Sequence, residues 1–311
     1  MRLVTFRTIN GHAHVGVVRN DTIVDLNRLL AADNDAALHR DFDMVDFIEM
    51  GDNGLDLARH ALAAADDHFS GANAPVKLDE SILLAPIPKP RKNVMCMGRN
   101  YAEHAAESVR AFNEAPSAAD KPEYLNMFTK ATTTINSPFG NIPYSAAMSE
   151  EIDWEVELAL VIGKTGKNIK QDRAMSHIYG YMVLNDISAR DIQKRHANQY
   201  FKGKSLDGSC PIGPWIVTAD EIADPSNLDI ALRVNGVEKQ HDNTRSMLFS
   251  IPEIIEQLSE GLTLEPGDII ATGTPSGVGM GRTPREFLRP GDVVECEIEH
   301  IGKIRNRVIS V

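Results

Sequence analysis

The stretch DWEVELALVIGKTG, residues 153–166, predicts a β-strand that ends in a turn and carries two glutamates on one face. Successive side chains of a strand point to opposite faces, so Glu155 and Glu157 share a face with Ala159 and Val161. Two like charges on a partly apolar face repel each other, and burial penalises each of them. Two explanations stay open at this point: the face is an exposed edge, or a cation lies between the two carboxylates.

The composition is typical of a soluble globular protein. The chain has 311 residues, of which 42% are hydrophobic and 24% are charged. Its formal net charge of −12 disfavours a nucleic-acid or anionic-membrane partner. The sequence contains no apolar run of the roughly 18 residues that a membrane span needs, and MRLVTFRTIN has no apolar h-region, so we expect no secretory signal. Three widely spaced cysteines make neither a disulfide framework nor a zinc site, which favours a cytoplasmic location.

The pattern along the chain predicts a small domain followed by a larger one. Residues 2–26 read as short strands, and residues 44–68 as helix interrupted at GDNG. The segment LAPIPKPRKN, residues 84–93, has three prolines within five residues and predicts a linker. We therefore expect a small N-terminal α+β domain at 1–85 and a larger domain at 86–311.

The larger segment is rich in short β patterns with few helices. No alternation of strands and helices argues for a doubly wound sheet, so the expected class is α+β and β-rich. The segment NEAPSAADKPE, residues 113–123, is small, polar and proline-bearing, which suits a mobile surface loop or lid.

A third carboxylate follows a predicted strand in GYMVLNDISARDIQ, residues 180–193. SARDIQ opens a predicted helix, with Ser188 as a plausible N-cap. Asp186 alone is most often a turn or capping residue. Together with Glu155 and Glu157, however, it makes a set of three carboxylates without a histidine or cysteine partner. Such a set suits a hard cation, Mg²⁺ or Mn²⁺, better than zinc.

Two further segments are weak signals by themselves. Lys202 and Lys204, in FKGKSLDGSCPIGPW, are surface lysines by default or, alternatively, anion-binding lysines near a metal. ATGTPSGVGMG, residues 271–281, is a loop that could present backbone N–H groups and hydroxyls to carboxylates or phosphates. It lacks the ending of a Walker phosphate loop.

GRNYAEHAAE, residues 98–107, places His104 and Glu107 three residues apart. If the segment is helical, the two side chains lie on one face. A carboxylate bonded to one imidazole nitrogen fixes the tautomer and raises the basicity of the other nitrogen. The pair is either an acid–base dyad able to activate water or an ordinary surface pair.

Taken in order, these motifs and LTLEPGDIIATGTPSGVG resemble the fumarylacetoacetate hydrolase family over residues 82–311. The segment before residue 82 resembles the N-terminal domain of the longer bacterial members. The resemblance implies a mixed β-sandwich roll or distorted β-barrel, usually dimeric. It also implies these roles: Glu155, Glu157 and Asp186 as ligands of Mg²⁺ or Mn²⁺, His104, Glu107 and Lys204 as catalytic residues, and Arg99, Arg190, Gln193 and Thr274 as substrate-binding residues.

The His-x-x-Glu spacing resembles the acylpyruvase and oxaloacetate decarboxylase branch of the family. The animal fumarylacetoacetate hydrolases add an aspartate ligand upstream and draw the carboxylate partner of the histidine from a distant segment. Neither arrangement is found in this sequence. Fumarylacetoacetate itself is therefore not the expected substrate.

The chemistry and the resemblance together imply a small 2-oxo acid as substrate, with the metal as a Lewis acid that stabilises an enolate. His104, oriented by Glu107, would activate water. The leading hypothesis is C–C bond hydrolysis of a 2,4-dioxo acid, either an acylpyruvate or a dioxo sugar acid. Oxaloacetate decarboxylation and 2-oxo-heptenedioate isomerisation are the alternatives. A non-catalytic metal-binding protein is the hypothesis from another class, and it predicts a damaged dyad.

Overall fold

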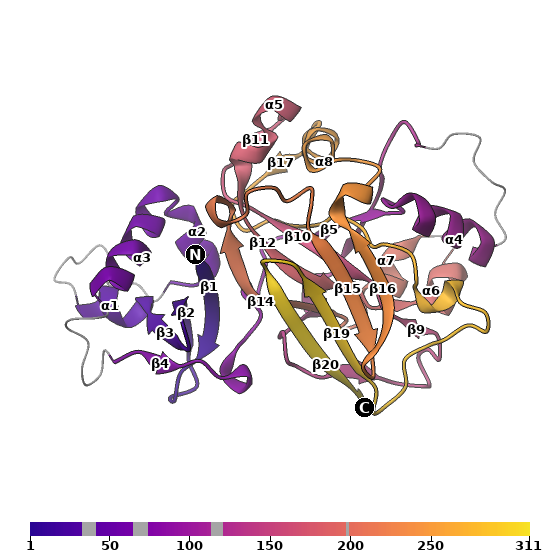
Figure 1. Cartoon of the computed structure of the whole chain (residues 1–311), viewed down its shortest axis with the longest axis horizontal. Coiled ribbons are helices and arrows are strands. Elements are labelled where there is room, and N and C mark those ends of the chain that lie inside the picture. Colours follow the sequence, from indigo (N-terminus) through magenta and orange to yellow (C-terminus); the bar gives the residue numbers. More distant parts are fainter. Residues whose placement is uncertain (33–41, 65–73, 113–120, 197–198) are drawn as a thin grey trace.

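The apolar part of the opening stretch forms β10 (Val156–Ile162), an interior strand of a large mixed sheet in the computed structural model of the chain (Figure 1). It pairs antiparallel with β12 (Ile178–Asn185) on one side and with β18 (Ile269–Ala271) on the other. All seven residues of β10 are buried. The exposed edge is therefore excluded as an explanation for the two glutamates. The structure describes five stretches of the chain: residues 1–32, 42–64, 74–112, 121–196 and 199–311.

The larger sheet joins strands from distant parts of the chain. Its order is β4 (Val76–Lys77), β3 (Thr22–Asp25), β2 (Ala13–Arg19), β1 (Arg2–Arg7), β14 (Cys210–Thr218), β12, β10, β18, β5 (Val94–Gly98) and β6 (Asn126–Lys130), with β7 (Ile135–Asn136) paired to β14. This path does not close, because the N-terminal strands extend one end and β6 forms the other. The β-rich α+β class is confirmed. Within that class the strands form open sheets, and the distorted barrel is not what the structure shows.

A second open sheet packs against one face of β10. Its order is β16 (Val237–Asn243), β15 (Asp229–Val234), β19 (Val293–Ile298), β20 (Gly302–Ser310) and β8 (Ile142–Tyr144). Val156 and Leu158 belong to the core between the two sheets. Ala159 and Val161 belong to a different core on the opposite face, which also contains N-terminal residues. The predicted alternation of β10 is thus confirmed, with both faces buried. Two short pairs complete the strands: β9 (Ile152–Asp153) with β13 (Ser188–Ala189), and β11 (Gly166–Lys167) with β17 (Thr263–Leu264).

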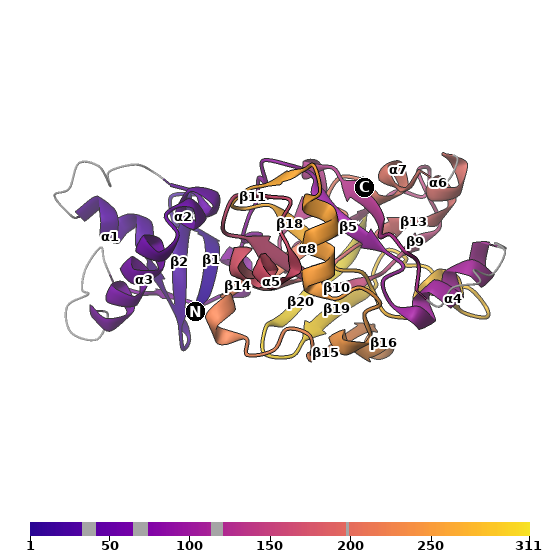
Figure 2. The ribbon, with the colours of Figure 1, turned by 90° about the horizontal axis from the view of Figure 1, so that it is seen from above.

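The N-terminal residues form one end of an elongated molecule, drawn in indigo and purple (Figures 1 and 2). The predicted strands appear as β1 to β3, and the predicted helical segment 44–68 appears as α2 (Met44–Glu49) and α3 (Asp52–Ala64), with α3 beginning inside GDNG. Residues 65–68 of that segment lie outside the described residues, and the sequence pattern does not predict α1 (Leu26–Ala32). β1 pairs with β14 through Leu3 and Ile216, so the main sheet runs across the expected linker. The division of the chain at residue 85 stays a prediction.

Three helices gather at the opposite end of the molecule (Figure 2). They are α4 (Ala102–Phe112), α6 (Arg190–Arg195) and α7 (Tyr200–Lys204). The remaining helical elements are α5 (Gln171–Ala174), α8 (Ile251–Ser259) and the short 3-10 turns η2 (Glu80–Ile82), η3 (Thr132–Thr134), η4 (Met175–His177), η5 (Ala219–Glu221), η6 (Thr244–Ser246) and η7 (Gly279–Gly281). In the described part of the chain, no helix is both long and apolar enough to cross a membrane. Of the expected loop or lid at 113–123, residues 113–120 lie outside the described residues.

The predicted capping role of Ser188 is wrong. Ser188 lies in β13, where its backbone pairs with Asp153. This pairing turns its hydroxyl toward the Asp186 carbonyl, to which it donates a hydrogen bond at 2.9 Å. The N-cap of α6 is Ala189, which has no side chain able to cap.

Candidate active site

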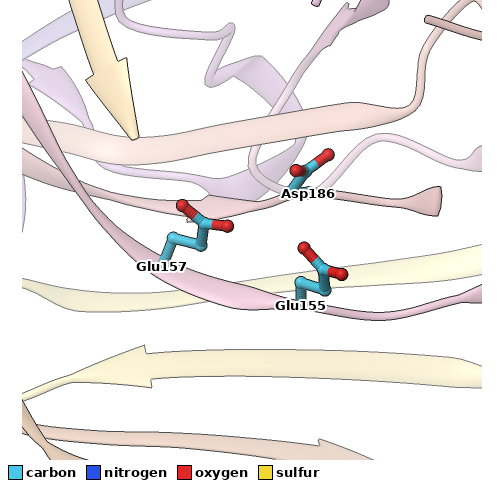
Figure 3. A group of neighbouring side chains, drawn as sticks. All are labelled: Glu155, Glu157 and Asp186. Atoms are coloured by element: carbon cyan, nitrogen blue, oxygen red, sulfur yellow. The ribbon is translucent and has the colours of Figure 1, made fainter. Parts of the chain in front are cut away.

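Three buried carboxylates meet where β10 begins and β12 ends. Glu157 lies in β10, Glu155 directly precedes that strand, and Asp186 directly follows β12. The Asp186 N–H donates to the Glu155 carbonyl at 2.8 Å, which holds the two strand ends together. One oxygen from each carboxylate lies within 4.8 Å of the others, and all three residues are at most 4% exposed. Figure 3 shows Glu155 and Glu157 leaving their strand on the same side, beside Asp186.

A cation does lie among these carboxylates, and it is a lysine. Lys204 Nζ is 2.7 Å from Glu155 Oε2 and 2.8 Å from Asp186 Oδ2. Its helix α7 approaches α6 closely at Gly203, where a Cβ atom would lie 2.8 Å from the Ala189 carbonyl oxygen. Lys204 is therefore buried, whereas Lys202 is exposed as the default interpretation predicted.

Two more cations pair with the same group. Arg190 Nη2 is 2.6 Å from Glu155 Oε1, and Lys130 Nζ is 2.7 Å from Asp186 Oδ1. Glu157 is placed differently, because its carboxylate accepts a hydrogen bond from the Gly273 N–H at 2.7 Å. Among the described residues, no ion pair to Glu157 is formed.

These environments separate the pKa values of the two glutamates. Burial alone would raise the pKa of Glu155, but the charges of Lys204 and Arg190 outweigh burial and lower that pKa to about 2. Burial, followed by the charges of Asp186 and Glu155, holds the pKa of Glu157 well above its usual value of 4.5. Glu157 is thus the carboxylate whose negative charge is least compensated.

The donor set fits a divalent cation. It consists of carboxylate oxygens only, which hard cations such as Mg²⁺ and Mn²⁺ prefer. Counting the neighbouring Asp153, four buried carboxylates face three buried cations, which leaves one negative charge when all are ionised. A bound divalent ion would reverse the sign of this local charge. Glu155, Glu157 and Asp186 would hold it.

His104 and Glu107 form a buried pair on α4. His104 Nδ1 is 3.2 Å from Glu107 Oε2, and the two residues are 5% and 7% exposed. Glu107 also accepts a hydrogen bond from the Gly277 N–H at 3.2 Å. The ordinary surface pair is therefore excluded. Because Nδ1 faces the carboxylate, Nε2 is the nitrogen turned away from it, where it lies 3.5 Å from the Ser108 hydroxyl oxygen.

The dyad and the carboxylate group border the same pocket. Of the residues expected in the site, the following line it: Arg99, His104, Glu155, Glu157, Arg190, Gln193, Lys204 and Thr274. Glu107 lies behind His104, and Asp186 lies behind Lys204. Another part of the wall is apolar and aromatic, formed by Met97, Phe112, Phe128, Tyr200 and Met280.

Besides Arg190, which pairs with Glu155, two more of the expected substrate-binding side chains have partners in the protein. The Thr274 hydroxyl donates to the Val156 carbonyl at 2.8 Å and accepts from Gln240 Nε2 at 2.8 Å. Gln193 Oε1 accepts from Arg190 Nη1 at 3.1 Å, so the amide group of Gln193 can still donate.

Residues 93–309 match the family described as Fumarylacetoacetate (FAA) hydrolase C-terminal. The chain belongs to this family. It is 48% identical over 231 residues to oxaloacetate tautomerase YisK of Bacillus subtilis (strain 168), which covers 74% of each chain. It is 42% identical over 314 residues to the mitochondrial oxaloacetate tautomerase Fahd2a of Rattus norvegicus, which covers 99% of this chain and 92% of the relative.

Solved structures agree with this assignment. A putative HpcE protein from Mycobacterium smegmatis superposes with a TM-score of 0.83 at 34% identity, over 100% of both chains. Maleylpyruvate hydrolase from Sphingobium sp. SYK-6, in complex with manganese(II) ion and pyruvate, superposes with a TM-score of 0.75 at 28% identity, over 100% of this chain and 99% of the other. The chain is therefore an enzyme of the fumarylacetoacetate hydrolase family.

Sequence reasoning missed two charged residues of the site. Lys130 is completely buried at the end of β6, and its Nζ also donates to the Ile187 carbonyl at 3.1 Å. A lysine after a short apolar segment gives no local sign of burial, so no signal could have found it. Asp153 is also completely buried. It was detectable, because it continues the period-two acidic pattern of Glu155 and Glu157.

Proposed function

We propose that this enzyme interconverts the enol and keto forms of a short 2-oxo dicarboxylic acid, with oxaloacetate as the expected substrate. The observation that carries the proposal is the position of His104 on the wall of the pocket that the carboxylates border. A proton-transfer group thus shares one cavity with a candidate metal centre. The names of the two tautomerase relatives support this choice of reaction.

The charge of the pocket favours an anionic substrate. With all four carboxylates ionised, the local balance is one negative charge without a metal and becomes positive once a divalent ion is bound. An anionic substrate such as a 2-oxo acid would neutralise this excess, whereas a neutral compound would leave buried charge uncompensated.

The reaction needs one proton removed from C3 and one delivered to the oxygen on C2, so the composition of the substrate does not change. When bound, Mg²⁺ or Mn²⁺ would polarise the keto oxygen and lower the pKa of the C3–H group. His104 Nε2 takes or returns the C3 proton, because Glu107 occupies Nδ1 and stabilises the imidazolium that forms. Lys204 and Gln193 orient the substrate oxygens.

C–C bond hydrolysis of a 2,4-dioxo acid is the second candidate. A buried dyad can also activate water, and the solved maleylpyruvate hydrolase supports this reaction for a similar fold. Decarboxylation of oxaloacetate and isomerisation of an oxo-heptenedioate would use the same pocket. Decarboxylation would not need water activation by His104.

A comparison of substrates tests the proposal. Purified enzyme with Mg²⁺ or Mn²⁺ would be mixed with freshly dissolved enol-oxaloacetate, with acetopyruvate and with a dioxo sugar acid. We expect the enol absorbance of oxaloacetate to disappear faster than in a sample without enzyme, and no CO₂ to be released. Cleavage of acetopyruvate with no effect on the oxaloacetate enol would replace tautomerisation by the hydrolytic candidate.

Three further features of the protein are proposals. The carboxylate donor set supports Mg²⁺ or Mn²⁺ as the resident ion, and the manganese complex of a similar structure is in line with it. A homodimer in the cytoplasm is the expected assembly and location. A division into domains at 1–85 and 86–311 is supported by the start of the family match at residue 93.

A further inference from the structure

Asp153, the first residue of the opening stretch, is a fully buried carboxylate that the proposed reaction does not use. It lies in β9, two residues before Glu155. Its oxygens are not part of the close group formed by Glu155, Glu157 and Asp186. A buried charge needs a compensating set of partners, and the identity of these partners shows what the residue does.

Both oxygens of Asp153 accept hydrogen bonds. Oδ1 accepts from the Gly279 N–H at 2.6 Å and from the Trp154 N–H at 2.8 Å. Oδ2 accepts from the Met280 N–H at 3.1 Å and from Arg190 Nε at 2.8 Å. One carboxylate therefore joins the backbone of η7 to the guanidinium of Arg190.

Arg190 carries this connection to the carboxylate group. Its Nη2 is 2.6 Å from Glu155 Oε1, and its Nη1 donates to Gln193 Oε1 at 3.1 Å. All three side chains are at most 4% exposed, so water does not screen their contacts. The position of Arg190 is thus tied to a candidate metal ligand on one side and to Asp153 on the other.

The η7 turn carries the connection to the dyad. Gly277, just before the turn, donates its N–H to Glu107, and Trp154 Nε1 donates to the Gly277 carbonyl at 3.2 Å. Gly281, the last residue of the turn, lies against the same glutamate. A Cβ atom at Gly281 would be 2.1 Å from Glu107 Oε1.

We propose that Asp153 is a positioning residue, whose carboxylate keeps the His104–Glu107 dyad in place relative to Glu155 by holding η7 against Arg190. It touches neither substrate nor reacting atoms. Its effect on the reaction passes through Glu107 and His104. The inference rests on the proposed function only in taking His104 as the proton-transfer group.

Asp153→Asn tests this role with a side chain of the same size. Its amide oxygen can still accept from Gly279, but its NH₂ group would face the donors of Met280 and Arg190. We expect kcat to fall about 10- to 100-fold, as displacement of a catalytic group does, while KM stays within about threefold. Isothermal titration with Mn²⁺ alone should give a Kd within about threefold of wild type, because the three ligands remain.

Asn306→Asp is the matched control for Asp153→Asn, because Asn306 is a buried residue that hydrogen-bonds a loop outside the site. Asn306 is also fully buried, and its amide donates to three loop carbonyls outside the site, those of Ser137, Pro138 and Gly140. We expect this variant to lower Tm and to leave kcat within about twofold of wild type. A loss of kcat in Asn306→Asp equal to that in Asp153→Asn would overturn the proposal, since any loosened loop would then suffice.

A double variant distinguishes an effect of Asp153 on kcat through the dyad from an effect that does not involve the dyad. If Asp153 acts through His104, adding Asp153→Asn to His104→Ala should lower kcat by less than about threefold. An equal loss in both backgrounds would show that Asp153 acts independently of the dyad, and the proposal would be wrong.

Gly281→Ala provides a second route if Asp153→Asn does not fold. The new methyl group would displace the buried Glu107 side chain, whose Oε1, Cδ and Cγ atoms would lie 2.1, 2.2 and 2.2 Å from it, and these nearest atoms include none of Asp153 or Arg190. We expect a similar loss of kcat at unchanged Mn²⁺ affinity. Wild-type kcat in Gly281→Ala would contradict the proposed link through η7.

Hydrogen exchange tests whether Asp153 holds α4 and η7 in place, without an assay of activity. Asp153→Asn should speed amide exchange across α4 and residues 277–281, whereas Asn306→Asp should not. Unchanged exchange in these segments would overturn the inference. If the wild-type enzyme turns over no 2-oxo acid, the proposed function fails, and the exchange experiment still tests the connection from Asp153 to the dyad.

Discussion

Lys204 Nζ and Glu155 Oε2 lie 2.7 Å apart within the group of carboxylates that would hold a metal. The ammonium group thus occupies part of the space where a divalent ion and its ligands would meet. Burial would lower the pKa of Lys204, but the charges of Asp186 and Glu155 outweigh burial and raise that pKa above its usual value. Lys204 is therefore a permanent positive charge next to the candidate metal centre.

Removal of this charge should strengthen metal binding while it weakens catalysis. In Lys204→Met, a bound divalent ion no longer meets a repelling ammonium, so we expect Mn²⁺ affinity to rise about tenfold or more. The kcat for enol-oxaloacetate should fall, because an oxygen-orienting group is lost. Isothermal titration and steady-state kinetics measure both effects. Lys202→Met, at an exposed lysine of the same helix, is the control. Weaker Mn²⁺ binding in Lys204→Met would mean that Lys204 supports the ligands instead of competing with the ion.

Removal of the metal should abolish activity and lower thermal stability. A ligand that binds only the folded state stabilises it by about 2.7 kcal/mol at 100 times its Kd. For a protein of this size, we expect that adding Mg²⁺ or Mn²⁺ back to the exhaustively chelated protein raises its Tm by roughly 5 °C. Glu157→Gln should lose most of this shift, because a ligand is neutralised. Full turnover of the chelated wild type would refute metal dependence.

The stability of the metal-free protein should fall as pH rises above about 4.5. The folded-state pKa of Glu157 is raised above its usual value of 4.5, so the folded protein holds this proton more tightly than the unfolded chain does. The stabilisation is complete below that value and is lost as pH rises through the folded-state pKa. Glu155, with a pKa lowered to about 2, acts in the opposite direction only below pH 4.5.

The Tm of the protein, measured between pH 5 and 8 in the presence of a chelator, tests this link between the Glu157 proton and stability. Glu157→Gln cannot ionise at this position, so its Tm should fall less with pH than that of wild type. Identical slopes for the two proteins would show that Glu157 is not the group responsible.

Loss of His104 should distinguish the candidate reactions. His104→Ala should lower the rate of enol–keto conversion about 10²- to 10⁴-fold, the usual contribution of general acid–base catalysis. Mn²⁺ affinity should stay within about threefold, because His104 is not among the grouped carboxylates. His60→Ala, at an exposed histidine of α3, serves as the control. Decarboxylation that survives in His104→Ala, while enol conversion is lost, would assign the dyad to proton transfer alone.

Local pattern was enough for much of the fold and of the candidate site. The period-two alternation in β10 placed Glu155 and Glu157 on one face, and His104 and Glu107 fell together because helical neighbours lie three residues apart. The order of short motifs was specific enough to identify the family. Each of these features depends on residues that are close in the chain, so one sequence contains the necessary information.

Long-range packing decided the rest. Whether the glutamate face was exposed or buried depended on β12 and β18, which pair with β10 from other parts of the chain. The local sequence predicts Ser188 as a helix cap, but its pairing with Asp153 in β9 directs its hydroxyl to the Asp186 carbonyl. Lys130 meets Asp186 across 56 residues of sequence, and Asp153 meets Gly279 across 126. The burial of a charge depends on which distant partners compensate it, and these partners are brought together only when the sheets pack.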